Sequence, residues 1–71
     1  MMRTDLENRA TVLSALTEKE AAKELGVSMK TLQAWRLKSR GPAYLKYGRA
    51  IRYLPHDLTA YAQGSRVQPR N

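Results

Sequence analysis

The side chains that could do chemistry in this chain are mostly cationic, and they gather in its second part. Residues 28–71 carry nine lysines and arginines and one acidic residue, Asp57, whereas residues 1–27 carry four basic and five acidic residues. A surface of this kind binds polyanions, so nucleic acid is the first expectation and an acidic membrane surface the second. A solvated basic surface without a partner is the plainer alternative.

Catalytic and metal-binding chemistry lack the residues they need. The 71 residues contain no cysteine and a single histidine, His56, which excludes disulfides and thiolate metal sites. No nucleophile stands at a recognisable spacing from His56, and no glycine-rich loop could cradle a phosphate. Glu18, Glu20 and Glu24 are expected to form a solvated helix face. We therefore expect no enzymatic activity, no cofactor and no metal site.

Two closely spaced helices are expected to position the first group of cations. The segment from Thr17 to Glu20 fits a capping box and Gly26 suits a helix end, which predicts a helix over 17–25. Ser28 is a second N-cap, and the pattern after it predicts a helix over 28–38. Two short helices joined by a tight turn that contains glycine form a helix-turn-helix.

The second of these helices has an inner and an outer face on a helical wheel. Met29, Leu32 and Trp35 fall together on the inner face, so we expect Trp35 to pack in the core and not to stack on bases. The outer face consists of Lys30, Gln33, Ala34 and Leu37, with Arg36 on its flank.

A β-hairpin is expected next. Residues 44–47 and 51–54 alternate with a period of two on either side of a turn at 48–50. This alternation places Lys46 and Arg52 together on the open face, with Arg49 at the tip. The residues expected to face the core are Leu45, Tyr47, Ile51 and Tyr53.

The elements together predict one small domain. Pro55 suits the start of a third helix, and Gly64 is expected to end it. Residues 16–64 should therefore fold as a winged helix-turn-helix, mainly α with a small β-hairpin. Residues 1–15 are expected to be an N-terminal extension that could hold a short helix, and residues 65–71 a disordered basic tail.

Two segments of the chain resemble the excisionase-type, MerR-like DNA-binding domains. The first reads LTxxEAAxxLGVSxxTLxxWR over 16–36, and the second reads GPxxxxxGRxIRYxxxDL over 41–58. The resemblance implies that the second helix enters a major groove and that the hairpin reaches an adjacent minor groove. It also implies either an excisionase of a phage or integrative element or a small transcription regulator. Members of the MerR family proper add a dimerisation helix and an effector domain, and neither follows here, so we do not expect a ligand-sensing regulator.

Nine residues are expected to contact DNA. Lys30 and Gln33 offer hydrogen bonds to base edges, lysine to guanine and glutamine to adenine. Ser28 and Thr31 lie at a helix N-terminus, where amides and hydroxyls bind phosphate. Arg49 suits a narrow, electronegative minor groove. The remaining cations, expected on phosphates, are Arg36, Arg40, Lys46 and Arg52.

We interpret the chain as a sequence-specific, architectural protein of the excisionase type that binds double-stranded DNA. Copies that are monomeric in solution would assemble cooperatively and head-to-tail near an attachment site, bend it and direct an integrase toward excision. Two alternatives stay open: a small phage or prophage transcription regulator, and a protein–protein adaptor with an acidic partner. No apolar run suits a membrane span or a signal peptide, so we expect a cytoplasmic, nucleoid-associated protein.

Overall fold

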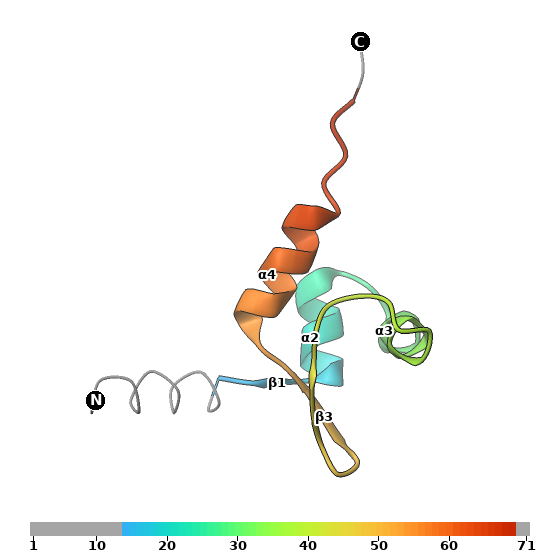
Figure 1. The fold of residues 1–71 in the computed structure, drawn as a ribbon, viewed down its shortest axis with the longest axis vertical. Helices are drawn as coiled ribbons and strands as arrows, with labels where there is room; N and C mark the ends of the chain where they lie inside the picture. The colour runs from blue at the N-terminus through green and yellow to red at the C-terminus, as the bar shows by residue number, and fades with distance from the viewer. Residues whose placement is uncertain (1–13, 70–71) are drawn as a thin grey trace, which may run out of the picture.

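Three short helices and a small antiparallel sheet make up the computed structural model, which describes residues 14–69 (Figure 1). The expected N-terminal helix and the end of the expected tail lie outside these residues. The elements in chain order are β1 (Leu16–Thr17), α2 (Glu18–Leu25), α3 (Met29–Leu37), β2 (Leu45–Tyr47), β3 (Ala50–Tyr53) and α4 (Pro55–Gly64). This arrangement confirms the winged helix-turn-helix fold, mainly α with a small β-hairpin, that the sequence predicts.

The capping box predicted at the start of α2 is present. The Thr17 hydroxyl accepts the Glu20 N–H at 3.1 Å, and the Glu20 carboxylate accepts the Thr17 N–H at 2.9 Å. At the other end Gly26 adopts the left-handed conformation with φ 74°, and the N–H of Val27 donates to the carbonyl of Ala22 at 3.0 Å. This Schellman arrangement ends the helix and turns the chain directly toward α3.

The residue at the start of α3 is a favourable cap, whereas the residue that ends the helix has an unfavourable backbone conformation. Ser28 is the predicted N-cap, and its hydroxyl accepts the Thr31 N–H at 3.0 Å. The helix ends on a second Schellman pattern, in which the N–H of Arg40 donates to the carbonyl of Trp35 at 2.7 Å. The left-handed residue here is Ser39, with φ 56°, although this conformation favours glycine.

Trp35 packs against the core, as the helical wheel predicts, and its ring meets two later parts of the chain. The ring centroids of Trp35 and Tyr61 of α4 lie 5.6 Å apart. Gly41, with φ 85°, comes so close to Trp35 that a Cβ there would lie 3.2 Å from both Cβ and Cε3 of the tryptophan. The chain therefore needs a glycine at this position both for its backbone angle and for the close approach.

The sheet has three strands in the order β1-β3-β2, one more than the hairpin predicted from the sequence. Leu16 of β1 pairs with Tyr53, and Thr17 pairs with Arg52. With only two residues, β1 is too short to show an alternating pattern. Its pairing makes β3 the central strand and ties the start of α2 to the hairpin.

The predicted register of the hairpin is wrong by one residue. The turn consists of Gly48, with φ 60°, and Arg49, so Tyr47 pairs with Ala50 and Lys46 with Ile51. Residues directly opposite in an antiparallel pair point to the same face, and a slip of one residue reverses the faces. Lys46 therefore shares a face with Ile51, and Arg52 shares the other face with Leu45 and Tyr47; Tyr47 is 53% exposed instead of buried.

The core lies where α2 meets α3, α4 and the sheet. Its buried residues are Ala21, Ala22, Leu32, Tyr53 and Leu58. The two alanines let the neighbouring elements approach α2 closely. Met29, expected on the inner face of α3, is 44% exposed, because the helix contacts the core through Leu32 and Trp35 and Met29 lies in the turn before them.

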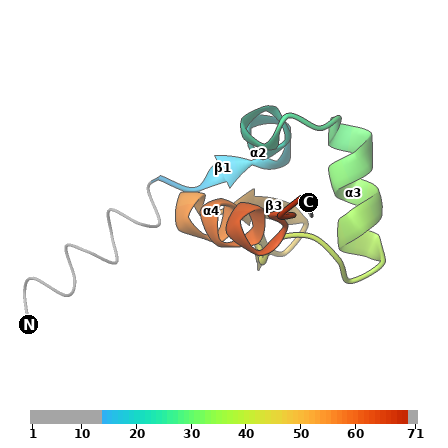
Figure 2. The ribbon, with the colours of Figure 1, turned by 90° about the horizontal axis from the view of Figure 1, so that it is seen from above.

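The helices and the hairpin project in different directions from this core. In both views α3 lies at one side of the molecule, apart from α4 (Figures 1 and 2). The hairpin extends beyond the helices at the lower end of Figure 1, and the end of α4 lies at the opposite end. Two elements, α3 and the hairpin, thus stand out from the core with their outer sides free. No helix within residues 14–69 is long and apolar enough to cross a membrane.

Candidate nucleic-acid interface

The outer side of α3 carries a ridge of exposed side chains. Lys30, Ala34 and Leu37 follow one another at helical spacing, and all three are exposed, with Leu37 at 77%. Gln33 beside them is half-buried and forms no side-chain hydrogen bond with another described residue. The ridge therefore offers a cation, a small side chain, an apolar side chain and a partly exposed amide to whatever lies against α3.

Exposed cations line α3, the segment after it and the hairpin. They are Lys30, Lys38, Arg40, Lys46 and Arg49. None of them forms an ion pair with any residue in the described range 14–69. The two-residue turn carries Arg49 at the end of the hairpin that projects farthest from the helices (Figure 1). These five charges are available to an anionic partner.

The two hydroxyls at the start of α3 are bonded to each other. The Ser28 hydroxyl donates to the Thr31 hydroxyl at 2.9 Å while it accepts the Thr31 N–H. Ser28 is exposed and Thr31 is half-buried. Their capping role is thus present, and their contact with a phosphate stays a prediction.

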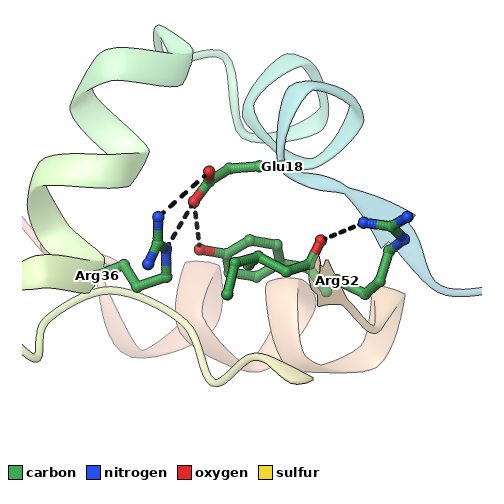
Figure 3. Close-up of polar contacts among 5 residues, drawn as sticks. Glu18, Arg36 and Arg52 are labelled. Carbon is green, nitrogen blue, oxygen red and sulfur yellow. Dashed lines mark hydrogen bonds and ion pairs between the residues drawn. The ribbon is translucent and has the colours of Figure 1, made fainter. Parts of the chain in front are cut away.

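Arg36, expected on a phosphate, lies against an internal partner instead. Its Nε donates to Glu18 Oε2 at 2.8 Å and its Nη2 to Oε1 at 3.5 Å (Figure 3). The side chains of Arg36 and Glu18 are only 20% and 13% exposed, so the expectation that Glu18 belongs to a solvated face is wrong. The hydrogen bond to the Glu18 carboxylate raises the pKa of Arg36 further above its ordinary value.

Two tyrosines lie against this ion pair: Tyr53, which is buried, and Tyr44, which is 40% exposed. The hydroxyl of Tyr53, in β3, donates to Glu18 Oε2 at 3.4 Å. Burial, and then the negative charge of Glu18, raise the pKa of Tyr53 from its ordinary value of 10.0 to about 12. The Tyr44 ring lies 6.0 Å from that of Tyr53, and the Arg36 guanidinium carbon lies 5.9 Å from the Tyr44 centroid. We call Glu18, Arg36, Tyr44 and Tyr53 the Glu18 cluster.

The wheel and strand patterns do not reveal the Glu18 cluster. The spacing of Tyr53 in its strand indicates that its ring is buried, which the structure confirms. No periodic pattern indicates that a glutamate 35 positions earlier accepts a hydrogen bond from the Tyr53 hydroxyl.

Arg52 is also engaged within the protein. Its Nη1 donates to the carbonyl of Ile51 at 2.7 Å (Figure 3), and its side chain is half-buried. Its positive charge is close enough to Glu20 to contribute to the lowered pKa of that carboxyl. Arg52 is therefore less accessible to a phosphate than Lys46 or Arg49.

Three hollows on the described surface are open to solvent. The hollows are shallow, and the one between β1, α2 and α4, of about 200 Å³, is lined mainly by Leu16, Leu25 and Leu58. Residues 14–69 contain no group of three or more histidine, cysteine, aspartate or glutamate side chains that could hold a metal ion. The accessible chemistry is therefore that of the exposed cations on α3 and the hairpin.

One comparison with known proteins gives a match. A family model described as a helix-turn-helix domain matches residues 15–66, which spans every helix and strand described above. No curated protein matches the chain. The match covers about three quarters of the residues and includes α3, the hairpin and all five exposed cations.

Proposed function

The chain belongs to the helix-turn-helix domain family and is a DNA-binding domain, and from this premise we propose that it recognises double-stranded DNA by sequence. The observation that carries the proposal is the set of exposed cations on α3, the segment after it and the hairpin. Lys30, Lys38, Arg40, Lys46 and Arg49 are exposed without an internal counter-charge, whereas the half-buried Glu18 is neutralised by Arg36. A row of uncompensated cations on two projecting elements suits the two phosphate strands beside a groove.

In this proposal α3 lies in the major groove. Lys30 and Gln33 reach base edges, where lysine pairs with guanine acceptors and glutamine with adenine. Ala34 is small enough to let the helix approach closely, and its methyl group can contact a thymine methyl. Ser28 and Thr31, at the first turn, lie where amides of a helix N-terminus meet a phosphate.

The hairpin lies over the adjacent minor groove. Gly48, with φ 60°, allows the tight two-residue turn that puts Arg49 at the tip. An arginine in this position suits the narrow minor groove of A·T-rich DNA, where the negative potential is strongest. Lys46 and Arg40 then face the phosphates on either side.

For the biological role we propose an excisionase, which acts without catalysis of its own. One short helix and one hairpin cover only a short stretch of DNA, so several copies are needed to specify and bend a longer site. The resemblance of residues 16–36 and 41–58 to excisionase-type domains supports this role. The partners would be attachment-site DNA and an integrase, and the copies would meet head-to-tail on direct repeats.

Footprinting over the DNA of the host genome tests this proposal. We expect adjacent protected repeats near an attachment site, stepwise and cooperative retardation of that DNA, a measurable bend, and a monomer by sedimentation without DNA.

A single protected operator at a promoter would favour a transcription regulator. No footprint, together with capture of an acidic protein by the same basic surface, would favour the adaptor. Arg49→Ala should weaken binding to the attachment-site DNA, and Arg66→Ala, which removes an exposed cation after α4, is its control.

A further inference from the structure

We propose that the Glu18 cluster fixes the orientation of α3 relative to the hairpin, so that Arg36 is a positioning residue for DNA recognition and not a phosphate ligand. The proposal rests on the proposed function, since a fixed angle between the two projecting elements matters only if both contact one DNA molecule. It concerns residues that no periodic pattern in the sequence brings together.

The cluster joins parts of the chain that are far apart in sequence. Glu18 starts α2, Arg36 is in the last turn of α3, Tyr44 precedes β2, and Tyr53 ends β3. The Glu18 carboxylate accepts hydrogen bonds from both Arg36 and Tyr53, so one side chain connects the end of α3 to β3, the central strand of the sheet.

The guanidinium of Arg36 is held on two sides. Two of its nitrogens point at the two oxygens of Glu18, in the paired geometry that gives arginine–carboxylate contacts their directional strength. The Tyr44 ring lies beside the guanidinium at a distance typical of a cation–π contact. With a side chain only 20% exposed, Arg36 would have to leave both partners before it could meet a phosphate squarely.

The cluster acts at the last turn of α3, beside Trp35. The start of α3 is fixed by the tight turn after Gly26, and its middle by the fully buried Leu32. Beyond Leu32, Trp35 packs against the core and Tyr61 and Arg36 binds Glu18, whereas Ala34 and Leu37 are exposed. If Arg36 is released, Trp35 is the contact that remains at this end, so α3 can tilt about Leu32 and Trp35, and the spacing between its outer ridge and Arg49 then varies.

The first experiment measures this spacing without DNA. The chain has no cysteine, so Leu37→Cys and Arg49→Cys place two spin labels, one on α3 and one on the hairpin tip, for pulsed electron paramagnetic resonance. We expect a narrow distance distribution in the otherwise unchanged protein and a clearly broader one after Glu18→Gln. Glu24→Gln, an exposed position on the same helix, is the matched control and should keep the narrow distribution. An unchanged distribution after Glu18→Gln would overturn the proposal, whether or not the protein binds DNA.

The second experiment separates positioning from phosphate binding. The probes are a duplex selected by the unaltered protein from random sequences and a scrambled duplex of the same composition. We expect Arg36→Gln to lower the ratio of the two affinities about tenfold and to leave the salt dependence of binding unchanged. A phosphate ligand would instead reduce the slope of log K against log salt by about 0.9 and affect both duplexes equally, which would contradict the proposal.

Two further variants test whether a loss of discrimination comes only from unfolding of the protein. The double variant Glu18→Gln with Arg36→Gln leaves no unpaired charge in the cluster, and Tyr53→Phe removes only the hydroxyl. Both should lower discrimination while circular dichroism shows a folded protein, and unchanged discrimination in both would contradict the proposal. If the unaltered protein selects no sequence at all, the proposed function fails, and the label distances still decide whether the cluster orients α3.

Discussion

At the scale of single residues, Ser39 is the position where the chain departs most from the residue type its backbone favours. The second Schellman pattern requires a left-handed residue, and Ser39 adopts φ 56° without the freedom that glycine has. A non-glycine residue in this conformation costs about 1–2 kcal/mol, which a glycine would avoid. Part of this benefit is lost, because a glycine also increases the conformational entropy of the unfolded chain.

We therefore expect Ser39→Gly to raise the free energy of unfolding by about 0.5–1 kcal/mol. Urea denaturation followed by circular dichroism measures the change. The matched control is Ser65→Gly at the end of α4, where φ is −94° and no such strain exists. Equal effects of the two substitutions would show that the left-handed angle at Ser39 carries no cost.

Glu20 makes the stability of the domain depend on pH in the acid range. The Thr17 N–H, and then the Thr17 hydroxyl contact, lower the pKa of this carboxyl below its ordinary value of 4.5. A group with a lowered folded pKa contributes stability that is present above the unfolded pKa and is lost as pH falls through the folded one.

We expect the unaltered protein to lose stability as pH falls below 4.5, and Glu20→Gln to lose less over the same range. Glutamine can still accept the Thr17 N–H but does not titrate. Thermal melts at a series of acid pH values measure the difference. Parallel profiles for the two proteins would contradict the role given to Glu20.

At the scale of elements, α3 and the hairpin are expected to make different contributions to DNA binding. The ridge of α3 offers hydrogen-bonding groups that can distinguish base pairs in a major groove, whereas the hairpin tip offers one arginine to a groove with a more degenerate pattern. Substitutions in the two elements should therefore differ in kind as well as in size.

Gln33→Ala is expected to remove about 1–3 kcal/mol of discrimination between the selected duplex and one altered at a single adenine. Arg49→Ala should weaken binding to both duplexes and leave their ratio nearly unchanged. Competition binding with the two duplexes measures both effects. Gln63→Ala, which truncates an exposed glutamine on α4, is the control. Unchanged discrimination in the Gln33 variant would remove Gln33 from the base-reading residues.

At the scale of the whole molecule, the chain carries a net charge of +7, and five of its basic residues are exposed on the projecting elements and the segment between them. The carboxylate of Glu18 is taken up by Arg36, and the five uncompensated cations lie on α3, the segment after it and the hairpin. The remaining described acidic residues lie on α2 and α4, which leaves the projecting side uniformly positive.

If all five exposed cations release counterions from the DNA, whether they meet phosphates or lie in a groove, log K should fall against log salt with a slope of about −4 to −5. Titrations at several salt concentrations measure the slope, and Lys38→Gln should make it less steep by about 0.9. Affinity that is insensitive to salt between dilute and physiological buffer would contradict contact with DNA through these side chains.

Local signals in the sequence were enough to predict the helices and the turn between them. Thr17 with Glu20, Gly26, and Ser28 with Thr31 act through hydrogen bonds or backbone angles that involve neighbours only a few residues away. The helical wheel of α3 likewise identified Leu32 and Trp35 as core residues and Lys30, Ala34 and Leu37 as exposed. Because these features depend on short stretches of chain, the sequence by itself determined them.

Tertiary structure alone decided the pairing of β1, the register of the hairpin and the partner toward which the Arg36 side chain points. A strand of two residues, such as β1, is too short to show an alternating pattern. The sequence of the hairpin is compatible with a turn of two or of three residues, and the two turns place opposite sets of side chains on each face. Arg36 lies on the flank of its helix, where solvent, a phosphate and Glu18 are all within reach of a long side chain. The packing of α2 against α3 brings Glu18 within 2.8 Å and thereby selects the internal partner.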